Sequence, residues 1–258
     1  MRIITQPTVY LVGSQVTDDA EIDRFLADHG VESWDTDASV AGEKLAEIAG
    51  RVCYMSFAKP RPGGNRAYLD RILESAHGSV LEHAVFNFVI TGVSRSFTHE
   101  LVRHRAGFGY SQLSQRYVDE SAADFVEPAC IAAAAELHEV WLAAVTECQH
   151  AYGKLVEGLM HHFADQPDKT LRRKLARQAA RSVLPNATET KIFVTANARA
   201  LRHFVEMRAS EHAETEIRTV AGLMLERLRR AAPNLFGDYE LIDLPDGTRA
   251  ARTARPKV

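Results

Sequence analysis

One arginine of this sequence occupies a position that helical periodicity assigns to a buried, apolar face. A helix is expected to begin at Asn197, which is a favourable N-cap residue. Its apolar stripe is formed by Leu201, Phe204 and Val205, and the next position of that stripe is Arg208. A guanidinium is costly to bury unless a carboxylate, a bound anion or several hydrogen-bond acceptors surround it. The position of Arg208 therefore predicts either an internal ion pair or a bound anionic ligand.

A second cationic group is the run Arg103-His104-Arg105, which follows an expected helix and precedes a glycine-containing loop over residues 106–110. Successive helical residues point about 100° apart, so the three side chains cannot reach one group from within a helix. At a helix end that opens into a loop, they can fan around an extended ligand. The pattern predicts a ligand larger than a single phosphate.

The segment that follows, residues 110–117, combines hydroxyl, amide and guanidinium groups in a short span. Ser114 and Arg116 are candidates to bind a phosphate, and the amide of Gln112 could read the edge of a base. Arg181 adds a further cation four residues after Arg177. The alternative for Arg181 is that it only complements the C-terminus of its helix.

The elements that position these residues indicate an α+β fold: a single mixed domain over residues 1–258, with a small central sheet and long helices. Strands are expected over residues 7–16, 82–91 and 188–196, with Gly92 ending the second. Helices are expected over residues 40–53, 66–76, 94–104, 137–163, 168–184, 197–208 and 213–232, and a surface loop over 59–64. The basic tail over residues 245–258 is expected to be flexible and frayed.

Composition excludes several classes of protein. The 258 residues carry a net charge of −3, which argues against a protein that holds nucleic acid through a global positive field. The three cysteines form no C-x-x-C pair, and there is no H-E-x-x-H motif, so neither a disulfide framework nor a metal site is indicated. No stretch approaches the roughly 18 apolar residues of a membrane span. A reducing cytoplasm and no membrane partner are expected.

The run from Arg103 to Tyr117, Arg-His-Arg-Ala-Gly-Phe-Gly-Tyr-Ser-Gln-Leu-Ser-Gln-Arg-Tyr, closely resembles the flavin-dependent thymidylate synthases. The family signature is R-H-R, seven residues and Ser, whereas eight residues, 106–113, precede Ser114 here. The simplest interpretation is one extra residue near the glycines. Further resemblance lies in His77-Gly-Ser-Val-Leu-Glu-His, in residues 176–185, and in Asn197-Ala-Arg, Phe204-Val-Glu-Met-Arg and Glu216-Ile-Arg.

The resemblance implies a homotetramer whose active sites are built from several subunits, with a family core over about residues 36–244. It implies FAD as a bound cofactor and the methylation of dUMP to dTMP with 5,10-methylenetetrahydrofolate and NADPH as co-substrates. The residues that would hold the flavin are Ser79, Arg103, His104, Arg105, Gln112, Asn197, Ala198, Arg199 and His203. Those that would bind dUMP are Glu100, Arg103, Gln112, Ser114, Gln115, Arg116, Arg181 and Arg208.

Arg208 is the expected catalytic residue, because a fixed cation beside the pyrimidine favours negative charge that develops at N3 and O2. Ser114 is expected to contact the ligand and not to act as a nucleophile, because no Ser-His-acid arrangement is legible nearby. For His83 the sequence leaves two alternatives, a structural role or a contact with a ring of the ligand. The alternatives are a FAD-containing NADPH oxidase, a nucleotide-binding flavoprotein of other chemistry, and a nucleic-acid-binding module in which Tyr110 and Tyr117 stack on bases.

Overall fold

The computed structural model describes residues 1–59 and 62–256, and it divides the chain into two compact units. The first unit comprises residues 1–8, 90–103 and 111–193, and the second comprises residues 9–89, 104–110 and 194–258. Neither unit is a continuous segment, because the chain passes between them several times. The expectation of one catalytic domain stays a prediction. Residues 60 and 61 of the expected surface loop lie outside the described residues, as do the last two of the tail.

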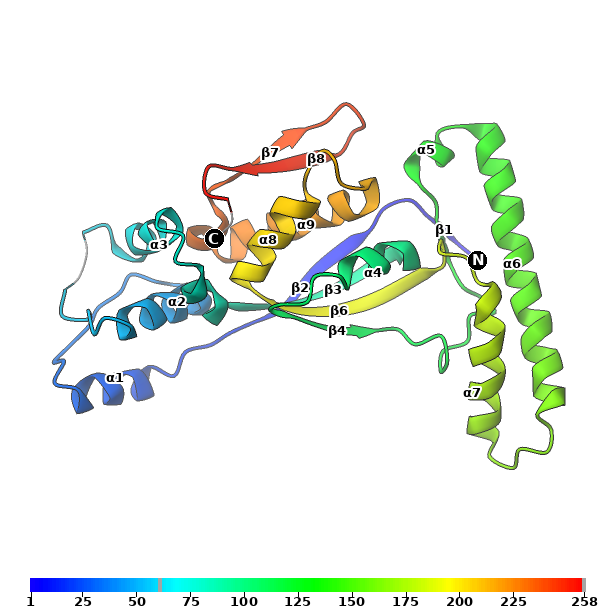
Figure 1. The fold of residues 1–258 in the computed structure, drawn as a ribbon, viewed down its shortest axis with the longest axis horizontal. Helices are drawn as coiled ribbons and strands as arrows, with labels where there is room; N and C mark the ends of the chain where they lie inside the picture. Colours follow the sequence, from blue (N-terminus) through cyan, green and yellow to red (C-terminus); the bar gives the residue numbers. More distant parts are fainter. Residues whose placement is uncertain (60–61, 257–258) are drawn as a thin grey trace. The chain divides into compact units, whose positions relative to one another are not determined.

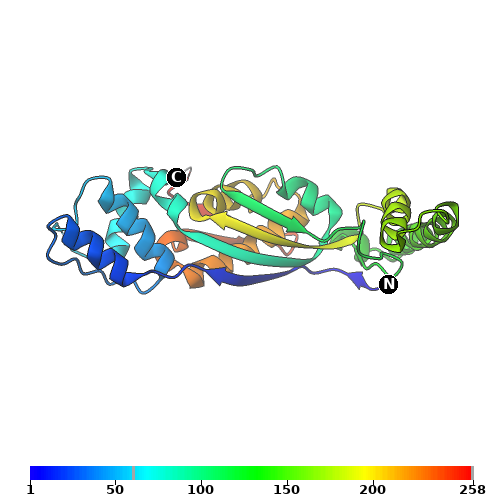
Figure 2. The same ribbon diagram turned by 90° about the horizontal axis from the view of Figure 1, so that it is seen from below.

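A four-stranded sheet confirms the mixed helix-and-sheet class. Its strands are β2 (Thr8–Ser14), β3 (Val85–Ser94), β4 (Phe108–Gln112) and β6 (Glu189–Asn197). They are ordered β2-β3-β6-β4, so that β6 lies beside both β3 and β4 (Figures 1 and 2). Three of these strands were expected from their apolar patterns, and β4 was not.

The alternation of buried and half-buried residues in β3 confirms that one face of this strand packs on a core. Phe86, Phe88 and Ile90 are at most 1% exposed. The expectation that Gly92 ends the strand is wrong: β3 continues to Ser94. Gly92 adopts a φ of +67°, and a Cβ there would lie 3.0 Å from the carbonyl oxygen of Gln6, so only glycine fits.

The first unit is mainly helical. It holds α4 (Arg95–Leu101), α5 (Ala129–Ala132), α6 (Ala135–His162), α7 (Lys169–Ala180) and the 3-10 turn η2 (Arg181–Val183). The short strands β1 (Ile3–Ile4) and β5 (Phe125–Val126) pair in parallel. Phe125 forms a buried cluster with Ala123 and Val145, and α6 packs along α7 (Figure 1).

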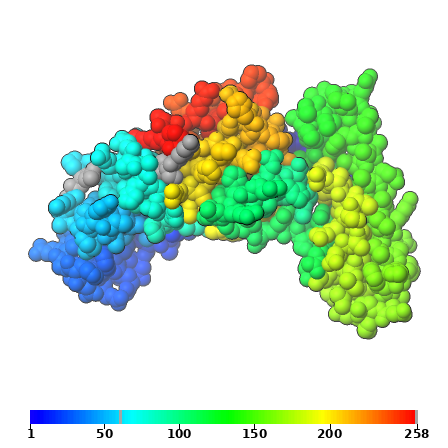
Figure 3. Space-filling view, viewed as in Figure 1, coloured from blue at the N-terminus to red at the C-terminus, as the bar shows by residue number. Residues whose placement is uncertain are grey.

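The apolar stripe of α6 is covered over only part of its length. Val145 and Tyr152 are buried, whereas Leu137 is 55% exposed and Leu155 is 39% exposed. The surfaces of α6 and α7 lie next to one another in the space-filling view (Figure 3). Among the described residues, no helix is both long enough and apolar enough to cross a membrane.

The second unit holds the helices α1 (Asp19–Asp28), α2 (Ala41–Val52), α3 (Gly64–Glu74), α8 (Ala198–Arg208), α9 (Thr215–Ala231) and α10 (Pro233–Phe236), and the 3-10 helix η1 (Gly78–His83). Helix α9 packs against α8 and α10. It buries Ile217, Val220, Met224 and Leu228 completely, at the spacing of one helix face. Burying such a side chain contributes about 1.5–3 kcal/mol.

The second unit ends in a hairpin of β7 (Tyr239–Asp243) and β8 (Arg249–Thr253), which are antiparallel. The expectation of a frayed tail is therefore wrong for residues 249–253. Arg249 forms an ion pair with Glu226, and the N–H of Ala251 donates to the carbonyl oxygen of Ala209 at 2.7 Å. The described basic residues of this tail, Arg249, Arg252 and Arg255, each have a carboxylate partner elsewhere in the chain.

Candidate active site

Helix α8 positions the arginine that the sequence placed on an apolar face. Asn197 caps this helix, because its side-chain oxygen accepts a hydrogen bond from the N–H of Ala200 at 2.9 Å. Leu201 and Phe204 are completely buried, and Arg208 lies half-buried in the last turn. The expected N-cap and stripe are both confirmed.

Arg208 and His104 contact each other directly. The Nε–H of Arg208 donates to Nε2 of His104, and the two nitrogens are 3.0 Å apart. Burial, the charge of Arg208 and the neighbouring His203 together lower the pKa of His104 from 6.5 to about 4. His104 is therefore neutral near pH 7, as a hydrogen-bond acceptor must be.

The loop at residues 104–110 packs against the start of α8. Gly107 adopts a φ of +73°, and a Cβ there would lie 2.7 Å from Nδ2 of Asn197 and 2.8 Å from Cβ of Ala200. The N–H of Asn197 donates to the carbonyl oxygen of Gly107 at 3.1 Å. The hydroxyl of Tyr110 donates to the carbonyl oxygen of His104 at 2.6 Å, which closes the loop. The close approach of this loop to α8 thus requires a left-handed glycine at position 107.

Most of the residues expected to hold the flavin lie in the second unit, and Asn197, Ala198 and Arg199 are at the start of α8. Ser79, Arg105, Arg199 and His203 are all solvent-exposed in this unit. Arg199 forms an ion pair with the similarly exposed Glu82, with Nη1 and Oε1 separated by 2.5 Å. Exposed pairs of this kind contribute little to stability, so a stronger anion can displace the carboxylate.

Ala198 differs from the other expected flavin residues. Its side chain is completely buried, and its N–H donates to the carbonyl oxygen of Ala84 at 2.8 Å. The side chain of Ala198 therefore offers no surface to a ligand.

The residues expected to bind the nucleotide lie mainly in the first unit. The Nε2 amide of Gln112 donates to the hydroxyls of Thr98 and Thr190, at 3.1 and 3.3 Å. The hydroxyl oxygen of Ser114 accepts from the N–H of Arg116 at 3.4 Å. Nε of Arg116 is buried and has no hydrogen-bond partner among the described residues. A buried donor without a partner is costly, which favours a ligand at this position.

Two further expected residues lie at the end of α4. The Nε–H of Arg103 donates to the carbonyl oxygen of His99 at 3.3 Å, and the Arg103 side chain is exposed. Glu100 is half-buried, and its carbonyl oxygen accepts from the N–H of Arg103 at 3.2 Å.

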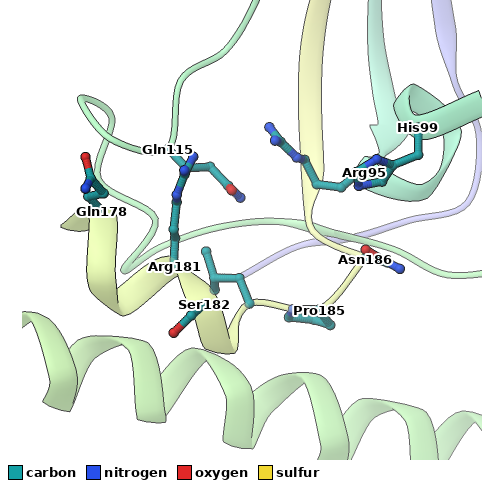
Figure 4. Close-up of a pocket in the computed structure, with 9 residues that line it drawn as sticks. Arg95, His99, Gln115, Gln178, Arg181, Ser182, Pro185 and Asn186 are labelled. Carbon is teal, nitrogen blue, oxygen red and sulfur yellow. The ribbon is translucent and has the colours of Figure 1, made fainter. Parts of the chain in front are cut away.

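A cavity of roughly 430 Å³ in the first unit brings Gln115 and Arg181 together with residues that were not expected. Arg95 and His99, on α4, line it together with Gln178 of α7 (Figure 4). The Arg95 side chain extends toward Gln115 in this view. Cations and amides from three parts of the unit thus share one opening.

The electrostatics of this cavity favour an anion. Burial and the charge of Arg181 lower the pKa of Arg95, while the charge of Glu120 acts in the opposite direction. Glu120 is itself buried, which raises the pKa of its carboxyl group. Two guanidinium groups that repel each other in a half-buried setting are stabilised by an anion placed between them.

Comparison with known proteins gives the relatives of this chain. Residues 36–234 match the family model described as thymidylate synthase complementing protein. The flavin-dependent thymidylate synthase of Mycobacterium avium is 52% identical over 229 residues, which is 88% of this chain and 90% of the relative. The enzyme of Mycolicibacterium vanbaalenii is 54% identical over 220 residues, 84% of this chain and 87% of its own. The chain belongs to the flavin-dependent thymidylate synthase family.

The fold agrees with this family. A crystal structure of the UMP/dUMP methylase PolB from Streptomyces cacaoi, bound with 5-Br dUMP, superposes with a TM-score of 0.66 and 21% sequence identity. The match covers 92% of this chain and 96% of PolB. The resemblance noted in the sequence is thus confirmed at the level of family and fold.

The sequence alone did not single out Arg95, His99 and Gln178, which line the cavity in the first unit. Arg95 and His99 stand four residues apart, which places them on one face of α4. This spacing is a usable signal, but the apolar stripe of Phe97 and Leu101 on the opposite face is the stronger pattern of the segment. Gln178 carried no comparable signal, because only the packing of α7 brings it to the cavity.

Proposed function

We propose that this chain catalyses the reductive methylation of dUMP to dTMP, with 5,10-methylenetetrahydrofolate as carbon donor, FAD as cofactor and NADPH as reductant. The identity of 52% over 88% of the chain to a flavin-dependent thymidylate synthase supports this reaction. The observation that carries it in the structure is the half-buried Arg208 on the core-facing side of α8, beside a neutral histidine.

The residues around α8 fit a flavin nucleotide. The exposed guanidinium groups of Arg105 and Arg199 can meet a diphosphate. His203, Asn197 and Ser79 add polar groups in the same unit. His104 completes the proposed set in this unit, and Arg103 and Gln112 are proposed as further contacts. FAD, when bound, supplies hydride transfer between NADPH and the nucleotide, chemistry that no side chain of the protein can perform.

The cavity between α4 and η2 is proposed to hold the phosphate of dUMP. Arg95 and Arg181 provide the charge, and Gln115 provides an amide. The buried Nε of Arg116 and the hydroxyl of Ser114 are further proposed contacts.

Arg208 is the proposed catalytic residue. Its charge is fixed and partly shielded from water, so it favours negative charge at N3 and O2 of a pyrimidine beside it. Glu100, Arg103 and Gln112 are the remaining proposed contacts of dUMP. Their role is to orient the substrate, which brings the reacting groups together without a protein nucleophile.

We also propose that the active form is a homotetramer with sites shared between subunits. The uncovered apolar side chains of α6, Leu137 and Val140 among them, support burial against further copies of the chain. The cysteines at 53, 130 and 148 are all free thiols, which supports a location in a reducing cytoplasm.

Purified protein provides the test of the reaction. We expect a yellow preparation whose flavin absorption is bleached by NADPH, and formation of dTMP only when dUMP, 5,10-methylenetetrahydrofolate and NADPH are all present. Bleaching with no dTMP would instead identify an NADPH oxidase. A colourless protein that binds single-stranded nucleic acid with steep salt dependence would identify a nucleic-acid-binding module.

The role of Arg208 is tested with a matched pair of arginine variants. Arg208→Ala is expected to remain folded and flavin-bound while losing almost all dTMP formation. Arg24→Ala removes an arginine that is 70% exposed on α1 and is expected to retain full activity. Equal rates for the two variants would show that the role of Arg208 is structural.

A further inference from the structure

The contact between His104 and Arg208 joins the loop at residues 104–110 to the last turn of α8, and its geometry has a defined direction. The donor is Nε of Arg208 and the acceptor is Nε2 of His104, 3.0 Å away. We propose that His104 is a positioning residue for Arg208, which holds the guanidinium in one orientation by accepting this hydrogen bond. The proposal rests on the catalytic role of Arg208 given above.

The acceptor role requires a particular protonation state of the imidazole. Nε2 must carry a lone pair, so the single proton of the neutral ring lies on Nδ1. The groups whose charge acts on the ring are Arg208 and His203, and both disfavour a second proton, as does burial. The pKa of about 4 keeps the ring neutral near pH 7, and a neutral ring can carry the lone pair on Nε2.

The ring of His104 is held in place from several sides. Phe204 meets it edge-on, with ring centroids 5.1 Å apart and planes at 80°. The rings of Phe108 and His203 lie at centroid distances of 6.0 and 6.1 Å. The hydroxyl of Tyr110 fixes the backbone through the carbonyl oxygen of His104. The acceptor is therefore packed between aromatic rings of its own unit.

A fixed acceptor at Nε has a consequence for the arginine. Rotation of the guanidinium about the Cδ–Nε bond changes the direction in which its planar fork points. The hydrogen bond to His104 is lost on such a rotation, so the bond restricts the fork to one orientation. Catalytic groups act through such preorganisation, because charge must be in place when it develops on the substrate.

Two neutral amide variants separate this role from simple ring contact. In His104→Gln the side-chain amide reaches the place of Nε2 and can still accept from Arg208. In His104→Asn the amide reaches only the place of Nδ1, and the bond is lost. Both side chains are polar, uncharged and smaller than imidazole, and they differ from each other by one methylene group and by the reach of the amide.

We expect His104→Gln to keep kcat for dTMP formation within about tenfold of the parent protein. Measured per bound flavin, His104→Asn is expected to lose a further factor of roughly 10 to 100 in kcat, the usual cost of a hydrogen bond to a charged group. His212→Gln is the control, because His212 is 88% exposed, and its rate is expected to match the parent. Equal rates per bound flavin for the Gln and Asn variants at position 104 would overturn the proposal.

Nitrogen-15 NMR of histidine-labelled protein tests the hydrogen bond without any turnover. We expect His104 to show a protonated Nδ1 and a bare Nε2 at pH 7, and its pKa to rise in Arg208→Gln. A protonated Nε2 would overturn the proposal whatever the activity. If the parent protein makes no dTMP, the proposed function fails, and the positioning role fails with it even where the tautomer is as expected. If dTMP forms but Nε2 is protonated, only the positioning role fails.

Discussion

Replacement of Gly107 by alanine tests how the loop before β4 is seated on α8. The φ of +73° costs an L-residue about 1–2 kcal/mol, and overpacking typically costs about 1–3 kcal/mol more. The new Cβ would meet Nδ2 of Asn197 at 2.7 Å and Cβ of Ala200 at 2.8 Å, and both belong to the rigid start of a helix. We therefore expect the free energy of unfolding to fall by about 2–5 kcal/mol.

The assay is urea unfolding followed by tryptophan fluorescence, together with the amount of FAD that co-purifies. Gly109→Ala is the matched control, because a Cβ there meets only ordinary contacts with Thr195, at 3.9 and 4.0 Å. We expect Gly109→Ala to keep the parent stability within about 1 kcal/mol. We expect Gly107→Ala also to lose flavin, since Asn197 must shift. Indistinguishable stability and flavin content for the two variants would refute this account of the loop.

Three further predictions follow from buried charges. Asp238→Ala should lower the free energy of unfolding by about 3–5 kcal/mol, because it removes the carboxylate that lies 2.6 Å from the fully buried guanidinium of Arg202. An unchanged midpoint of urea unfolding would contradict this. Arg95→Gln and Arg181→Gln should each weaken dUMP binding by roughly 10-fold or more while sparing deoxyuridine, as titration would show, whereas equal losses for both ligands would argue against a phosphate site. The free energy of unfolding should fall as the pH drops from 6.5 to about 4, because the unfolded chain binds a proton that the folded His104 rejects. His104→Gln should flatten this fall, and superimposable pH curves would contradict the assignment.

The parts of the site that follow helical periodicity were predictable from the sequence. The stripe of α8 located Arg208, and the capping preference of Asn197 located the start of the helix. Both depend on contacts within a few residues along the chain, which is the range over which local propensity acts.

The parts that depend on long-range packing could not be predicted. Arg95 of α4 and Gln178 of α7 line the same cavity, and only the tertiary structure brings these two helices to it. The sequence of the tail is typical of a solvated basic segment. In the structure, Arg249 forms an ion pair with Glu226 of α9, and residues 249–253 form β8. Charge patterns along a sequence do not show which distant carboxylate will pair with an arginine. The segment that forms β8 was therefore predicted to be a frayed end.

Strand β4 is a further element that the sequence pattern did not predict. Phe108 and Tyr110 alternate with Gly109, and glycine lowers the strand propensity of the segment. The neighbouring β6 supplies the hydrogen bonds that make it a strand.

The most direct test of the central claim is release of tritium from dUMP labelled at C5 of the pyrimidine. With purified protein, NADPH and 5,10-methylenetetrahydrofolate, we expect tritium in water in proportion to dTMP formed, and we expect almost none with Arg208→Ala. Absence of release from the parent protein that has bound both FAD and dUMP would contradict the account.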